Sequence, residues 1–127
     1  IKSQGGLVGI PHPFGRWPLQ NSNKLLSGEI LSLVDIIEVF NSRTPFPNSS
    51  SKAQKLVAEQ GLAASAGSDA HTIGEIGRAY VEMPEFNSPD DFINCLSQGM
   101  IFGHRSSPLV HLASTWAKIK KHTVVTK

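Results

Sequence analysis

The chain has 127 residues, of which 39% are hydrophobic and 17% are charged, a composition typical of a folded globular protein rather than a disordered segment. This length accommodates one compact domain and is too short for two ordinary ones. The net charge is only +2, from 12 basic and 10 acidic side chains. The charge therefore gives no reason to expect nucleic acid or an acidic membrane as the main partner.

Cysteine content and hydropathy bear on the compartment. The only cysteine, Cys95, cannot form an internal disulfide, which fits a reducing compartment. No apolar run approaches the roughly 20 residues that span a bilayer, and no leader pattern precedes a cleavage site. We therefore expect a cytoplasmic protein without a membrane partner. Because Ile1 stands just before an apolar stretch, we also expect the chain to be part of a longer protein.

The first half of the chain predicts two strands separated by a loop and a short helix. The apolar run at 7–10 follows two glycines and is stopped by prolines, which is typical of a strand buried on both faces. The polar stretch 16–23 is a predicted loop, and 24–33 is a predicted short helix. Residues 34–40 are rich in β-branched and aromatic side chains, so they give the strongest strand signal.

The middle of the chain predicts a loop, a helix and two strands. Residues 44–49 contain two prolines and are a predicted loop. An amphipathic helix is predicted over 51–60, with a capping serine at its start and Gly61 at its end. The residues expected on one side of this helix are Ala53, Leu56, Val57 and Gln60. Predicted strands follow at 62–66 and 79–83.

The end of the chain predicts two helices with similar starts. Ser88 and Pro89 are followed by two aspartates, which predicts a helix running to about Gln98 and ended by Gly99. A second serine–proline pair at 107–108 predicts a last helix to about residue 121. Strands alternating with helices at short spacing indicate an α/β domain with parallel strands. The tail contains a group of lysines that we interpret as a solvated helix end: Lys118, Lys120, Lys121 and Lys127.

Polar side chains stand at the carboxyl ends of three predicted strands. His12 follows the first strand, Glu38 and Asn41 end the second, and Asp69 and His71 follow the third. The carboxyl ends of parallel strands share one edge of the sheet, which is where such sheets bind ligands. We therefore expect these three groups to face the same edge.

Asp69 and His71 are separated by one residue, so in an extended segment both side chains point to the same side and can reach one metal ion. Imidazole together with carboxylate suits zinc, manganese or iron rather than calcium. The alternative for Asp69 is a capping role in the next turn, with His71 on the surface. The alternative for His12, which lies between two prolines, is an ordinary histidine in a polyproline-like loop.

Glu38 stands between two apolar residues, so it either faces a polar edge or is buried with a partner. A buried carboxylate needs a cation or hydrogen-bond donors. Regular alternation along the strand would place Asn41 on the opposite face. Only one of these two residues can then reach the site, unless the backbone turns between them.

Three segments resemble motifs of a known superfamily. They are 6–14 (GLVGIPHPF), 37–43 (IEVFNSR) and 67–80 (GSDAHTIGEIGRAY). They are similar, in order and spacing, to the later motifs of the PHP superfamily, named for polymerase and histidinol phosphatase. The strong resemblance defines a predicted unit at 1–83. Residues 84–127 are similar to the tail appended to PHP domains in small stand-alone phosphoesterases.

The resemblance implies a fold and an activity. The fold is the C-terminal half of a distorted seven-stranded β/α barrel, followed by a small helical C-terminal extension. The activity is hydrolysis of a phosphomonoester or phosphodiester at a site of two or three divalent ions, which could be manganese, iron or zinc. The implied partner is a small phosphorylated substrate. We also expect a truncated barrel to self-associate through its exposed strand edges.

Site residues are carried over from the resemblance position by position. His12, Asp69 and His71 match metal ligands. Glu38 and Asn41 match positions that support or line the catalytic site. A phosphate-binding arginine is also expected, and Arg78, the nearest to the metal motif, is preferred over the two others considered, Arg43 and Arg105.

The sequence departs from the family pattern, because the expected N-terminal His-x-His pair and further ligands are missing. Three ligands can hold one metal ion but not a cluster, so we expect this chain alone to be inactive. Two alternatives remain: a PHP remnant acting as a structural or interaction module, and a small α/β domain whose incidental histidines lie far apart. The other histidines are predicted to be structural or solvated: His104, His111 and His122. Cys95 is predicted to be a packed, inert thiol.

Overall fold

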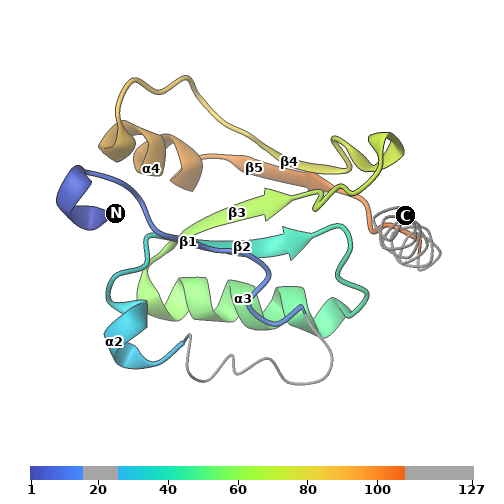
Figure 1. Ribbon diagram of the computed structural model, residues 1–127, viewed down its shortest axis with the longest axis horizontal. Coiled ribbons are helices and arrows are strands. Elements are labelled where there is room, and N and C mark those ends of the chain that lie inside the picture. Colours follow the sequence, from blue (N-terminus) through green and yellow to red (C-terminus); the bar gives the residue numbers. More distant parts are fainter. Residues whose placement is uncertain (16–25, 108–127) are drawn as a thin grey trace, which may run out of the picture.

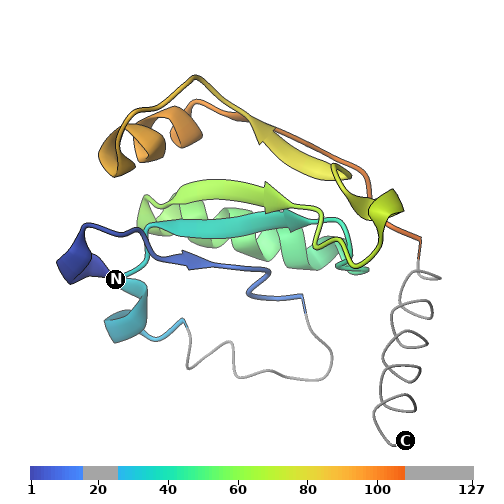
Figure 2. The same ribbon diagram turned by 45° about the horizontal axis from the view of Figure 1, so that its top comes forward.

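The computed structural model describes residues 1–15 and 26–107, which form a layered α/β arrangement (Figure 1). The middle layer is a three-stranded sheet of β1 (Gly9–Ile10), β2 (Ile36–Asn41) and β3 (Ala63–Gly67). Helix α3 (Pro47–Gln60) covers one face of this sheet. The other side carries α4 (Pro89–Ser97) and a two-stranded sheet of β4 (Ala79–Glu82) and β5 (Met100–Gly103) (Figure 2). The short helices are η1 (Lys2–Gln4), α2 (Gly28–Leu31) and η2 (Ile73–Glu75).

The three-stranded sheet is parallel throughout, as predicted, with β2 between β1 and β3. Strands β2 and β3 were both predicted, and their bounds lie within about two residues of the predicted ones. Strand β1 is shorter than the predicted 7–10, because the pairing with β2 begins only at Gly9. Before that point the Val8 N–H donates to the side chain of Asp35 at 2.7 Å rather than to a backbone carbonyl.

The core lies between β2 and α3. Alternate residues of β2 point toward the helix, and Ile37 and Val39 are 0% and 3% exposed. Val34 and Ala53 complete the buried cluster. Because β2 side chains alternate, Glu38 points away from this core, toward the side of the sheet that carries α4.

Helix α3 is longer than predicted at its start. It begins at Pro47, so the prediction of a loop at 44–49 and of a serine cap before residue 51 was wrong. Proline fits the first helical position because its missing N–H has no partner there in any helix. The predicted end is confirmed: Gly61 adopts the left-handed conformation, with φ of 64°. Ala53, Leu56 and Val57 do pack toward the core, whereas Gln60 is exposed.

Helix α4 confirms the predicted start, because the Ser88 hydroxyl accepts the Asp91 N–H at 3.1 Å. Cys95 in this helix is buried, and burial together with nearby Asp91 raises the pKa of its thiol. The thiol is therefore protonated and inert at neutral pH, as predicted. It also donates toward the Glu85 carbonyl, with sulfur and oxygen 3.4 Å apart.

The β4–β5 sheet corrects the expectation of a wholly parallel arrangement. Strand β4 was predicted, but β5 was not, and the two are antiparallel. The described residues thus form a mixed α/β fold of five strands in two sheets, and they do not form a seven-stranded barrel. His104 follows β5, and its N–H donates to the Arg78 carbonyl at 2.8 Å.

Some predictions fall outside the described residues. These are the loop at 16–23, the first residues of the helix predicted at 24–33, the helix predicted from 108 to about 121, His111, His122 and the lysine group of the tail. Within the described part, only Gly28–Leu31 of the first of these helices is helical. None of the helices in this part is both long enough and apolar enough to cross a membrane.

Candidate functional site

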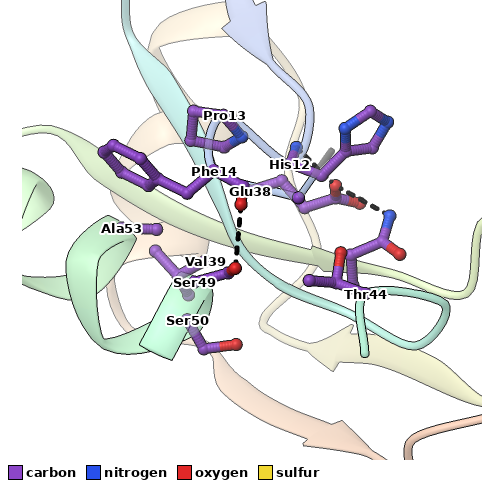
Figure 3. Close-up of a pocket in the computed structure, with 11 residues that line it drawn as sticks. His12, Pro13, Phe14, Glu38, Val39, Thr44, Ser49, Ser50 and Ala53 are labelled. Carbon is purple, nitrogen blue, oxygen red and sulfur yellow. Dashed lines mark hydrogen bonds between the residues drawn. The ribbon is translucent and has the colours of Figure 1, made fainter. Parts of the chain in front are cut away.

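His12 lies just beyond the carboxyl end of β1 and is anchored to β2 through its backbone. Its N–H donates to Glu38 Oε2 at 2.8 Å, and Figure 3 shows the imidazole on the same side as that carboxylate. The backbone of His12 has φ of 29°, in the left-handed region that non-glycine residues rarely adopt. The Glu38 carboxylate is therefore a backbone anchor for a predicted metal ligand.

Asn41 reaches the same carboxylate because β2 is irregular. The pairing of β2 with β3 shifts register between Glu38 and Phe40, which inserts one extra residue into β2. Such a bulge bends the strand and increases its local twist. The Asn41 amide, beyond this bulge, donates to Glu38 Oε2 at 3.1 Å. Glu38 and Asn41 are therefore in direct contact, with an irregularity of the β2 backbone between them. That both belong to a catalytic site stays a prediction.

Gly67 leaves the space that the Glu38 carboxylate occupies. A Cβ atom at Gly67 would lie 2.3 Å from Glu38 Oε1, far inside contact distance. We therefore expect Gly67→Ala to displace this carboxylate and weaken its bond to the His12 N–H, which two-dimensional NMR would detect as a large shift of the His12 amide signal. Gly74→Ala is the matched control, since no atom lies within 4 Å of a Cβ there. An unmoved His12 signal in Gly67→Ala would contradict this geometry.

Asp69 and His71 follow β3 and are close to each other. His71 Nδ1 lies 2.8 Å from the backbone carbonyl of Asp69 and 3.9 Å from Asp69 Oδ1. If Nδ1 donates its proton to the carbonyl, the lone pair is on Nε2, the form in which imidazole binds metal. Both side chains are solvent-accessible, with 36% of Asp69 and 44% of His71 exposed. Asp69 also has a positive φ of 49°.

Glu75 is a site-adjacent residue that sequence reasoning missed. Its side chain is only 1% exposed and pairs with Arg43, with 2.7 Å between Arg43 Nη1 and Glu75 Oε1. Its other oxygen accepts the Thr72 hydroxyl at 2.9 Å and the His71 N–H at 3.2 Å. Burial by itself would raise the pKa of Glu75, but these hydrogen bonds and the guanidinium together hold that pKa below its ordinary value. Glu75 is thus ionised at neutral pH.

The three arginines considered for phosphate binding all have partners within the protein. Arg43 is buried against Glu75, so it is placed to hold structure rather than to meet substrate. Arg105 lies over the Phe40 ring, with the guanidinium carbon 5.5 Å from the ring centroid, and donates to the Thr44 carbonyl. Arg78 is half-buried, and its Nε donates to the Gly74 carbonyl at 3.0 Å. A phosphate-binding role for Arg78 stays a prediction.

The fit of a metal ion to these residues can be tested on their arrangement. Across residues 1–15 and 26–107, no three side chains of His, Cys, Asp or Glu form a group that could hold an ion. Of the predicted ligands, Asp69 and His71 lie close to each other, just after the carboxyl end of β3. Beside His12 and Glu38 lies a cavity of about 10 Å³, which has room for about one water molecule and none for a substrate. The ligand set of His12, Asp69 and His71 therefore stays a prediction.

Part of the chain is similar to a known protein family. Residues 47–101 match the family described as PHP-associated. These residues are therefore similar to the C-terminal, PHP-associated region of PHP-family proteins. The matched PHP-associated segment begins with α3 and ends in β5, so it contains Asp69 and His71 but not His12. It also spans the predicted domain boundary at 83–84, which stays a prediction.

A relative extends the similarity beyond the PHP-associated segment. An uncharacterized protein of Methanocaldococcus jannaschii is 38% identical over 106 residues, a match that covers 76% of this chain. The same match covers 45% of that relative, so the chain spans less than half of the relative's length. No solved structure matches this chain.

Proposed function

We propose that this chain supplies half of the metal site of a PHP-family phosphoesterase that hydrolyses a small phosphorylated substrate. The backbone carries the proposal. In the described residues, the non-glycine positions with positive φ are His12 and Asp69, both predicted metal ligands. Strained backbone of this kind costs about 1–3 kcal/mol per residue and gathers at functional sites. The ligand prediction depends on residue type and place in the sequence, whereas the φ angle is a property of the folded backbone, so the two observations are independent.

The chemistry follows from the donor types. His12, Asp69 and His71 would hold manganese, iron or zinc, and the bound ions would polarise the phosphate and lower the pKa of a water molecule. Glu38 and Asn41 would support the site by fixing the His12 backbone. Arg78, near the Asp69–His71 segment, would bind a phosphate oxygen once its bond to Gly74 is exchanged. The protein would act in the cytoplasm, on neither nucleic acid nor membrane.

The proposed fold of the whole protein is a β/α barrel of which this chain forms one part. Strand β1 lies at an edge of its sheet and can accept another strand. A groove of about 350 Å³ lies next to it, with mainly apolar lining from Ile10, Ile36, Phe92 and Leu96. Added strands would cover this groove. Without them, we expect the chain to self-associate through the same edge.

The test has two stages. Mn²⁺, Zn²⁺ and Fe²⁺ are first titrated into the 127-residue chain by calorimetry, and about one ion per chain is expected to bind. Hydrolysis of p-nitrophenyl phosphate and bis(p-nitrophenyl) phosphate is then measured for this chain and for a longer chain carrying upstream sequence. We expect metal-dependent hydrolysis from the longer chain and none from the 127-residue chain. Absence of both binding and hydrolysis from folded proteins would overturn the proposal.

One observation favours a second candidate, a non-catalytic PHP-family module that serves structure or interaction. In the part of the chain that the structure describes, no three side chains of His, Cys, Asp or Glu form a group that could hold an ion, which fits a module without a catalytic metal site. The metal titration separates the two candidates, because a non-catalytic module without a metal gives no binding isotherm. A module with one structural ion would bind metal but add no hydrolysis to the longer chain.

A further inference from the structure

A buried polar segment at the carboxyl end of β2 contacts both halves of the candidate site. Asn41 and Arg43 in this segment are 4% and 6% exposed, although both carry polar side chains. Polar groups buried to this degree need hydrogen-bond partners. Asn41 bonds to Glu38, and Arg43 pairs with Glu75. The segment thus lies between the residues that hold His12 and the residues that hold His71.

The contacts form one continuous path between the two histidines. Glu38 Oε2 accepts the His12 N–H at 2.8 Å and the Asn41 amide at 3.1 Å. Asn41 Oδ1 in turn accepts the Arg43 N–H at 2.9 Å. The path holds each histidine through its backbone N–H and uses neither imidazole.

The far end of the path depends on a buried ion pair. Arg43 Nη1 donates to Glu75 Oε1 at 2.7 Å, and Glu75 Oε2 accepts the His71 N–H at 3.2 Å. The side chains of Arg43 and Glu75 are 5% and 1% exposed. At each end of the path, therefore, a carboxylate accepts the backbone N–H of a histidine that is a predicted metal ligand.

The energetics argue against a purely stabilising role for the pair. Two charges removed from water lose hydration free energy, and their mutual attraction offsets this loss only in very good geometry. Proteins in which such a pair is replaced by apolar residues of similar volume are often equally stable. The ion pair also holds an acceptor, Glu75 Oε2, for the His71 N–H and the Thr72 hydroxyl. An apolar pair would offer no such acceptor. The pair thus controls where the segment after β3 lies.

We propose that Arg43 and Glu75 are positioning residues that hold the His71 backbone at a fixed place relative to β2, so that metal binding at His71 depends on their ion pair. The proposal deepens the proposed function and rests on it for the metal. The positioning itself is a property of the chain alone. Removing a group that orients a ligand typically lowers metal affinity by about 10- to 100-fold.

The test uses Glu75→Gln and Arg43→Lys in the full 127-residue chain. Gln preserves the shape of residue 75 but removes its charge, and Lys preserves the charge of residue 43 but removes the guanidinium. The matched control is Glu59→Gln, which breaks the exposed Lys55–Glu59 pair, with 3.6 Å between nitrogen and oxygen. Zn²⁺ and Mn²⁺ affinity is measured by calorimetry well below the unfolding temperature, and amide hydrogen exchange at His71 is measured without metal.

We expect both site variants to bind metal about 10- to 100-fold more weakly than the wild type and to exchange the His71 amide about tenfold faster, with no change in Glu59→Gln. Wild-type affinity in variants that are folded would overturn the proposal. If the wild type binds no metal, the proposed function fails on this chain, and the exchange rates decide the positioning alone. Unchanged exchange at His71 in Glu75→Gln and Arg43→Lys would then overturn it.

Discussion

Asp69→Asn is expected to lower the affinity of the chain for Mn²⁺ or Zn²⁺ by at least about 100-fold, the upper end of what a supporting residue costs. An amide lacks the negative charge that makes carboxylate a good ligand for these ions. Asparagine is the informative substitution because residue 69 has φ of 49°. Asn tolerates the left-handed region, whereas alanine would add backbone strain to the loss of the ligand.

The measurement is calorimetric titration of each ion, with circular dichroism to show that the variant is folded. Asp90→Asn is the control, since Asp90 is an exposed residue in the first turn of α4. It removes the same charge from the chain at a position away from the three predicted ligands. Equal affinity of wild type and Asp69→Asn would remove Asp69 from the ligand set, and with it the proposed metal site.

Elements with a strong local signal were predicted well from sequence. Strand β2 carries a run of β-branched residues, and α4 opens with Ser88 and Pro89, whose effects act within one turn of the chain. Strand β5 had no such signal. Its four residues, Met100–Gly103, form a short apolar run, which fits a strand or the end of a helix equally well. It becomes a strand because β4 offers an edge, and β4 is distant in sequence.

The start of α3 shows a different limit. Pro45 and Pro47 both precede the predicted start of this helix, and the prediction treated both as loop residues. Pro47 instead occupies the first helical position, where its ring is compatible with the helix. One serine was expected as the cap, but Ser49, Ser50 and Ser51 all lie inside the helix. The local pattern identified the helix but not its first residue, which is Pro47 rather than the predicted Ser51.

The candidate site was also only partly predictable from the sequence. His12, Glu38, Asn41, Asp69 and His71 were predicted because each stands at the end of a recognisable strand. The contact between Glu38 and Asn41 spans a bulge in β2, which no residue pattern predicted. Glu75 was missed because its meaning depends on Arg43, 32 positions earlier. A buried ion pair between distant loops leaves no periodic trace in a sequence.

Ile37→Ala is expected to lower the free energy of unfolding by about 2–5 kcal/mol, the range for truncation of a large buried aliphatic side chain. Ile37 is fully buried at 0% exposure, in the cluster that joins β2 to α3. The loss combines less apolar burial with the cavity left behind, since the neighbouring β2 backbone is fixed by pairing on both sides. Urea unfolding followed by circular dichroism measures the change.

Leu33→Ala is the matched control, because Leu33 is 55% exposed and loses little burial when truncated. We expect its free energy of unfolding to fall by less than about 1 kcal/mol. The comparison also concerns the site, because Glu38 follows Ile37 directly and its carboxylate anchors His12. If Ile37→Ala unfolds at the same urea concentration as Leu33→Ala, the β2–α3 interface is not the core that holds the carboxyl end of β2 in place.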